Sequence, residues 1–250
     1  MKKKVSKSLS AEHPIIAKKI DKTLKLSIRE GSFSSATAGF GYHYLSPYAL
    51  ALNATTSQIG ILSAVISLLP SFVQLKASRF IEKFSRKKVV VWSVLLQALM
   101  FIPIILTGVL FYYNVPYTIW ILIGLIGLLY AFGAMGHPAW FSWMGSLVPE
   151  DQRGRYFSRR YRVTGFFGLI TMIIGALILD QFRTMGIVLI GFGILFSLAM
   201  IARLVSSKLL SEQYEPHLKI GKRDYFSFFQ FLKKAPATPF GRFSLFTAAM

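Results

Sequence analysis

Two histidines stand inside long apolar stretches of the sequence. His43 is flanked by Tyr42 and Tyr44, and His137 lies three residues before Trp140. An imidazole changes its charge near neutral pH and can bind a polar solute or hydrogen-bond a neighbouring helix. Because an ionisable group is costly to place among apolar neighbours, it is a candidate for a functional site by default. His43 and His137 are therefore the leading candidates for chemistry in this chain.

A second group of ionisable residues forms a short basic segment that contains one acid. Within residues 78–88, Glu82 stands beside Lys83, and Arg86 and Lys87 follow. A carboxylate at a helix end can pair with a basic group in one conformation and release it in another, which would bias a two-state equilibrium. The alternative is a solvated basic loop that only sets the orientation of the chain.

The elements that hold these residues are long apolar segments. Hydrophobic residues make up 54% of the 250 residues, charged residues only 16%, and the mean hydropathy is +0.52. A helix needs about 20 apolar residues to cross a hydrocarbon core, and six segments are this long. The expected spans are 28–52, 57–75, 89–112, 117–147, 161–179 and 184–205. The sequence predicts an all-α polytopic membrane protein with a six-helix transmembrane bundle, since the alternation typical of a transmembrane barrel is missing.

The distribution of basic residues predicts the orientation. All of the 29 lysines and arginines except Arg183 fall on one side of the expected membrane. Cytoplasmic loops carry such an excess, so we expect the N-terminus in the cytoplasm of a multi-pass plasma-membrane protein. Glu30 and Asp180 fall near span ends, and no basic group is expected deep in a span. The sequence therefore predicts neither a carboxylate relay nor an anionic solute, and the solute class stays open.

Several other functions are disfavoured. A net charge of +19 would suggest a nucleic-acid partner in a soluble protein, but here the basic blocks alternate with apolar spans, so no nucleic-acid partner is expected. The absence of cysteine excludes disulfides and thiolate ligands. No catalytic constellation or Walker sequence is present, so we expect neither an enzyme nor a bound metal or other cofactor.

The expected organisation has four parts. Residues 1–27 form a basic cytoplasmic segment, either an amphipathic helix on the inner leaflet or a solvated tail. Residues 28–205 form the bundle, and 206–239 form a cytoplasmic connector. Residues 240–250 begin like a seventh span and stop at half the required length, which suggests a fragment; the alternative is a short interfacial segment.

This arrangement resembles the N-terminal half of a major facilitator superfamily transporter. Residues 78–88 are similar to that family's Gly-x-Leu-Ala-Asp-Arg-x-Gly-Arg-Lys motif, with Glu82 for the acid and Lys83 for its basic neighbour. Arg86 and Lys87 correspond to the terminal pair. Residues 149–155 are similar to the family's Pro-x-x-x-Arg-Gly loop, in which Arg153 is the arginine.

The resemblance implies a secondary-active or facilitative transporter that moves a small solute by alternating access, with spans one and four lining the path. The implied substrate-path candidates are Tyr42, His43, Tyr44, His137 and Trp140, and the implied conformational-switch residues are Glu82, Lys83, Arg86, Lys87 and Arg153. The implied partners are the lipid bilayer, the solute, and a missing C-terminal half or a second copy. The alternative is a structural or receptor-like polytopic membrane protein that transports nothing.

Overall fold

The computed structural model describes residues 14–216, 236, 238, 241–243 and 246, without the side chains of residues 14, 15 and 75–83. The chain divides into two compact units, Met1–Glu215 and Pro216–Met250. Most of the expected connector and of the expected start of a seventh span lies outside the described residues. The long helices described all belong to the first unit.

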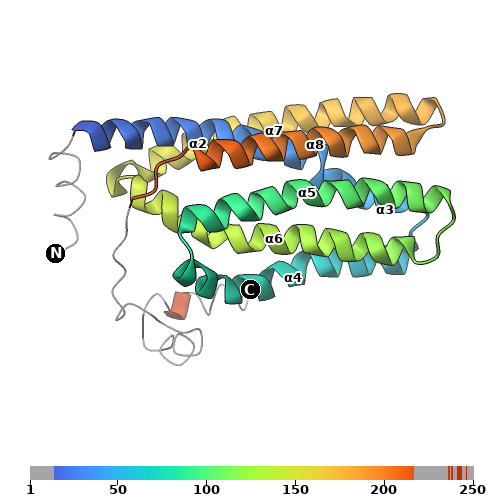
Figure 1. Ribbon diagram of the computed structural model, residues 1–250, viewed down its shortest axis with the longest axis horizontal. Coiled ribbons are helices and arrows are strands. Elements are labelled where there is room, and N and C mark those ends of the chain that lie inside the picture. Colours follow the sequence, from blue (N-terminus) through green and yellow to red (C-terminus); the bar gives the residue numbers. More distant parts are fainter. Residues whose placement is uncertain (1–13, 217–235, 237, 239–240, 244–245, 247–250) are drawn as a thin grey trace. The chain divides into compact units, whose positions relative to one another are not determined.

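The described part of the first unit consists of helices and the short turns that join them. Its elements in chain order are α2 (Pro14–Phe40), η1 (Tyr42–Tyr44), α3 (Leu45–Ala51), α4 (Thr56–Lys83), α5 (Arg86–Tyr112), α6 (Thr118–Leu147), η2 (Glu150–Gln152), α7 (Arg153–Thr184) and α8 (Val188–Ser211) (Figure 1). Five described helices are long and apolar enough to cross a membrane, and they correspond to the expected spans two to six. The prediction of an all-helical polytopic membrane protein is confirmed.

The first expected span is not one continuous helix. It consists of α2, a short 3₁₀ turn and α3, and it breaks at Gly41. A Cβ at Gly41 would lie 2.8 Å from the Phe101 ring and 2.9 Å from the Cβ of Ala199. The break therefore occurs where the first span is pressed against both α5 and α8. Pro47 lies in the first turn of α3, where its missing N–H has no helical partner to lose.

The basic N-terminal segment is a direct extension of the first span. From Pro14 onward it is the first part of α2, with Thr23 and Ser27 buried. The lysines at 18, 19, 22 and 25 are exposed. One face of residues 16–27 therefore packs against the bundle, and the other carries the exposed lysines.

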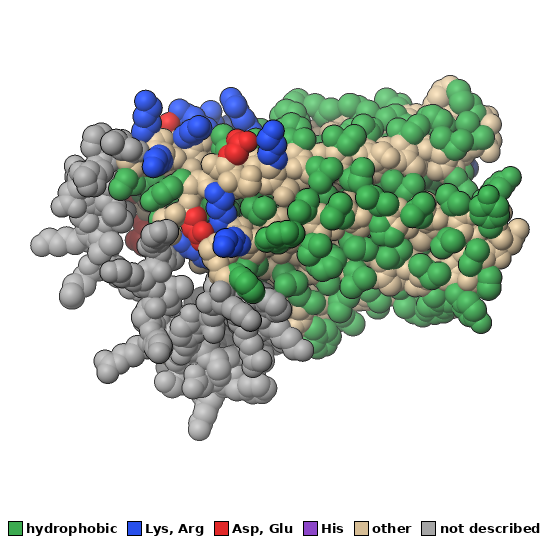
Figure 2. All heavy atoms as spheres, viewed as in Figure 1, with side chains coloured by type: hydrophobic (Ala, Val, Ile, Leu, Met, Phe, Trp, Pro, Cys, Tyr) green, Lys and Arg blue, Asp and Glu red, His purple; other side chains and the backbone are tan. Residues whose placement is uncertain are grey.

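The long helices pack in a fixed order. α6 lies against α4 and α5, α5 against α8, and α2 against α7 and α8. The core includes an aromatic group in which the ring centroid of Tyr48 lies 5.2 Å from that of Phe192 and 5.0 Å from that of Phe196. Figure 2 shows hydrophobic side chains over most of one face of this unit, with the visible acidic and basic side chains gathered toward one end. This pattern is typical of a bundle that faces lipid along most of its length.

The last helix runs further than expected. α8 continues through residue 206, the expected start of the connector, to Ser211. Ser206 and Ser207 are buried, and Ser207 donates a hydrogen bond to the Val91 carbonyl at 3.3 Å. These polar residues belong to the bundle because their hydroxyls find partners on other helices.

Candidate functional site

A polar cavity of about 180 Å³ lies among α2, α5, α6, α7 and α8. Its polar and aromatic lining includes Glu30, Ser34, Gln97, His137, Trp140, Phe141, Arg160, Tyr161 and Arg203. Three of these residues carry formal charges, and all three are buried: Glu30 is 4% exposed, Arg160 8% and Arg203 9%. Buried charges are stable only when partners hold them, so their contacts define the site.

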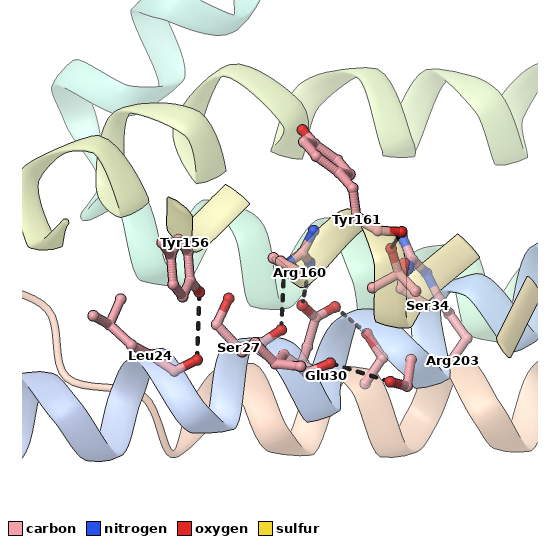
Figure 3. Close-up of polar contacts among 12 residues, drawn as sticks. Leu24, Ser27, Glu30, Ser34, Tyr156, Arg160, Tyr161 and Arg203 are labelled. Atoms are coloured by element: carbon pink, nitrogen blue, oxygen red, sulfur yellow. Dashed lines mark hydrogen bonds and ion pairs between the residues drawn. The ribbon is translucent and has the colours of Figure 1, made fainter. Parts of the chain in front are cut away.

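An ion pair joins α2 to α7 at the wall of this cavity. The Nη2 of Arg160 donates to Oε2 of Glu30 at 3.1 Å, and its Nε donates to the Ser27 carbonyl at 3.3 Å. Figure 3 shows Arg160 reaching toward Ser27 and Glu30. The second carboxylate oxygen of Glu30 accepts a hydrogen bond from Ser206 of α8 at 2.8 Å. One carboxylate therefore connects three helices.

The guanidinium of Arg203 on α8 is held by neutral oxygens. Its Nε donates to Oε1 of Gln97 at 3.1 Å, Nη2 donates to the same oxygen, and Nη1 donates to Ser34 Oγ at 2.7 Å. Gln97 is itself oriented, because its Nε2 donates to the Leu129 carbonyl at 3.1 Å. Arg203 thus ties α8 to α2 and α5 through groups that carry no charge.

Glycines allow the helices to approach closely around the charged groups. A Cβ at Gly31 would lie 2.8 Å from a guanidinium nitrogen of Arg160. A Cβ at Gly133 of α6 would collide with the side-chain amide of Gln97. The side chains of Arg160 and Gln97 therefore occupy the space that larger residues would fill.

Two of the predicted substrate-path residues line this cavity. Trp140 places its ring 4.4 Å from the Cζ of Arg160, a cation–π contact, and His137 lies edge-on to Phe141 with ring centroids 4.9 Å apart. Both come from α6, the expected fourth span. The structure therefore brings His137 and Trp140 together with the buried charges.

The other three predicted path residues lie elsewhere. His43 lines a separate groove with Tyr161 and Gly168, between the first span and α7. The buried Tyr44 donates a hydrogen bond to the Met172 carbonyl at 2.6 Å, and the ring of Tyr42 stacks on that of Phe101. Tyr42 and Tyr44 therefore pack against α5 and α7 at the break in the first span.

The predicted switch residues on α5 anchor the chain that follows α8. Arg86 is buried, donates from Nη1 to the Ser142 carbonyl at 2.9 Å, and lies 3.5 Å from Oε1 of Glu215. The Nζ of Lys87 donates to the Gln213 carbonyl at 2.8 Å. Arg86 and Lys87 thus hold together the ends of α5, α6 and α8. The side chains of Glu82 and Lys83 lie outside the described residues.

Arg153 donates hydrogen bonds to carbonyl groups at the C-terminal end of α6. Its Nη2 donates to the Gly145 carbonyl at 2.8 Å and its Nε to the Val148 carbonyl at 3.4 Å. The last carbonyls of a helix lack intrahelical donors, so a guanidinium there is stabilising. The contact with Glu150 is an exposed pair at 3.9 Å and adds little.

The sequence interpretation did not predict that these charges are buried. It placed Glu30 near a span end and counted Arg160 and Arg203 among the basic blocks, and the side chains of all three are buried in the bundle. A signal was present, because Glu30 and Arg203 both fall within the limits of expected spans. An acid and a base inside such limits predict mutual or shared polar partners. Among the described residues, no group of three or more histidines and acids could hold a metal ion.

The fold and this site define a polytopic helical membrane protein whose bundle encloses charged groups. Comparison with protein families shows to which family the chain belongs. The family model described as Major Facilitator Superfamily matches residues 31–250, so the chain is a member of this superfamily. The protein is a multi-pass membrane transporter of the major facilitator type. Neither the curated proteins nor the solved structures contain a match to the chain.

Proposed function

We propose that the protein moves a small solute across the plasma membrane by alternating access, with its N-terminus in the cytoplasm. The mechanism is secondary-active or facilitative, and the solute binds in the polar cavity among α2, α5, α6, α7 and α8. Membership of the superfamily supports transport. The exposed lysines of α2 support the orientation, because basic residues favour the cytoplasmic side.

One observation carries this proposal: the cavity wall contains a buried ion pair between helices. Replacing such a pair by apolar residues is often neutral or stabilising, so packing alone gives no reason to keep it. Inside membrane helices, charged side chains that pair across a cavity commonly mark a substrate or ion pathway. Glu30 and Arg160 fit this description, since both line the cavity and lie on different helices.

The same pair supports a conformational role. Glu30 connects α2 to Arg160 of α7 and to Ser206 of α8. A solute that bonds to one of these groups competes with the links between helices. It then has different affinities for the linked and unlinked conformations, which is the requirement for shifting a two-state equilibrium. Alternating access uses such a shift.

The partners of the bundle are the lipid bilayer, the solute, and a C-terminal half or a second copy of the chain. α4 is the span with the smallest buried share, 6% of its most apolar window. Ser63, Ser67 and Ser71 recur along an exposed face of this helix, and Ser63 and Ser67 each donate to a carbonyl four residues earlier at 2.9 Å. Small residues with satisfied hydroxyls allow another helix to approach closely, so we assign this face to the partner half or copy.

The test is labelling of single cysteines from both sides of the membrane. The 250 residues contain no cysteine, so His137→Cys introduces a single thiol at the cavity. A membrane-impermeant maleimide, applied to cells and to inverted vesicles, is expected to label this variant from both sides. The control is Leu99→Cys, whose position on α5 is exposed on an apolar face and is expected to stay unlabelled in lipid. Labelling of His137→Cys from one side only would contradict alternating access.

A further inference from the structure

The charges that line the polar cavity do not balance. Two guanidinium groups, those of Arg160 and Arg203, face one carboxylate, that of Glu30. No other residue that lines the cavity is an acid, so Glu30 supplies the only negative charge in the lining. The cavity wall therefore carries one excess positive charge.

The excess charge can be assigned to Arg203. Arg160 has its counter-charge, because its Nη2 lies 3.1 Å from Glu30 Oε2 and its guanidinium also lies over the Trp140 ring. In the described part of the chain, the hydrogen bonds of Arg203 all go to Gln97 and Ser34. Amide and hydroxyl oxygens orient a guanidinium but do not neutralise it.

A buried guanidinium held by neutral oxygens favours an anion beside it. Charge-assisted hydrogen bonds to carboxylates are about twice as strong as those between neutral groups, and the planar guanidinium fits a carboxylate with two parallel bonds. The attraction is greatest where water is scarce, and Arg203 is buried. Gln97 is fixed by its own bond to the Leu129 carbonyl, so Arg203 is already oriented before a ligand enters.

The rest of the lining indicates what the anion carries besides its charge. Trp140, Phe141 and Tyr161 supply aromatic surface, and Val94 and Leu210 supply aliphatic surface. The volume of about 180 Å³ is below the roughly 300–1,000 Å³ of pockets for drug-sized ligands. A small body with apolar surface fits this space better than a fully hydrated inorganic ion.

We propose that the cavity binds a small organic monoanion, a carboxylate with an apolar or aromatic body, and that Arg203 contacts its oxygens. This inference rests on the proposed function, since it names the solute class for the same cavity. Arg160 and Glu30 complete the wall as a neutral pair, and Trp140 and Phe141 contact the apolar body. The proposal replaces the expectation, based on sequence alone, that no basic group marks an anionic solute.

The test measures binding to the protein expressed from its intact gene and held in lipid nanodiscs. The probes are benzoate, its neutral analogue benzamide, and inorganic phosphate, each followed by calorimetric titration. Benzoate is expected to bind saturably and at least tenfold more tightly than either of the others. Equal affinities for benzoate and benzamide, tighter binding of phosphate, or no benzoate binding would overturn the proposal.

Substitutions then assign the contact. Arg203→Gln is expected to weaken benzoate binding at least tenfold and to leave benzamide unchanged, whereas Arg203→Lys retains part of the affinity because it keeps the charge. The control is Lys208→Gln, which removes an exposed positive charge from the same helix and should not alter binding. Unchanged benzoate binding in Arg203→Gln would refute the role of Arg203.

A second readout covers the case in which Arg203→Gln does not fold. In the His137→Cys variant, benzoate is expected to slow maleimide labelling at the cavity, and benzamide at equal concentration is not. Equal protection by both would overturn the anion assignment. Counterflow of radiolabelled benzoate in proteoliposomes separates the two proposals: binding without counterflow supports the anion site but contradicts transport of this class of solute. Counterflow of benzamide but not of benzoate refutes the anion site and leaves transport standing.

Discussion

At the scale of residues, one helix holds two ion pairs that differ in environment. On α2, Lys25 Nζ lies 2.7 Å from Asp21 Oδ2, with both side chains more than half exposed. Further along, Glu30 lies 3.1 Å from Arg160 and is buried. Water screens the first pair, so it contributes little to stability. Loss of one partner in the second pair leaves an uncompensated charge inside the bundle.

This difference gives the first prediction. Glu30→Gln is expected to lower the free energy of unfolding by about 3 kcal/mol, because the Arg160 guanidinium loses its counter-charge. The measurement is the midpoint of thermal unfolding in detergent. Asp21→Asn is the matched control on the same helix, with an expected change within about 0.5 kcal/mol. Similar midpoints for the two variants would show that burial does not make the inner pair essential.

Residue types alone indicated only part of the cavity lining. His137 and Trp140 were candidates because they are ionisable and aromatic residues inside an expected span, and both line the cavity. Arg160 and Arg203 were missed because each lies next to other basic residues in sequence, and a count of charges per loop cannot tell a buried arginine from an exposed one. The position of a residue around the helix decides whether its side chain is buried. Arg159 and Arg160 are neighbours in sequence but point in different directions from α7, so Arg159 is exposed and Arg160 is buried.

At the scale of elements, the chain after α8 fastens the ends of three other helices. Trp143 of α6 donates from Nε1 to the Tyr214 carbonyl at 3.0 Å, and the Tyr214 N–H donates to Thr23 of α2 at 3.0 Å. Arg86 pairs with Glu215 in the same segment. Arg86 and Lys87 of the basic segment therefore anchor this end of the bundle through polar contacts.

The second prediction concerns the break in the first span. Gly41→Ala is expected to destabilise the fold by about 1–3 kcal/mol, since the added Cβ would press on Phe101 and Ala199. Gly124→Ala is the control: a Cβ at Gly124 on α6 meets nothing within 4 Å. This change is expected to be neutral or stabilising by about 1 kcal/mol through helix propensity. Equal losses of thermal stability in both variants would remove the steric explanation.

The sequence predicted the five long helices α4 to α8, but it did not predict the break at Gly41 in the first span. Runs of apolar residues between basic blocks locate a membrane helix directly, and the expected spans two to six each fall on one helix. Gly41 looks like the other glycines of the sequence, because the atoms that make it special belong to α5 and α8. Such contacts exist only in the folded bundle, so local sequence could not indicate them.

At the scale of the whole bundle, charge and apolar surface are separated along the helices. The acidic and basic side chains visible in Figure 2 gather toward one end of the first unit, and hydrophobic side chains cover the rest of that face. α2 brings its exposed lysines to one end, whereas the turn between α5 and α6 exposes Tyr113 and Asn114. Because cytoplasmic loops carry an excess of basic residues, we expect the basic end of the bundle in the cytoplasm.

The third prediction tests this orientation. Lys22→Cys places a thiol on the exposed basic end of α2, and Tyr113→Cys places one on the exposed turn after α5. An impermeant maleimide added to intact cells is expected to label Tyr113→Cys and to spare Lys22→Cys, and inverted vesicles are expected to give the reverse. The same two positions serve as controls for each other, because both side chains are exposed and differ only in the end of the bundle they occupy. Labelling of Lys22→Cys in intact cells would show that the N-terminal end of α2 lies outside the cell. The excess of basic residues would then face the cell exterior, contrary to the bias of basic residues toward the cytoplasm on which the orientation rests.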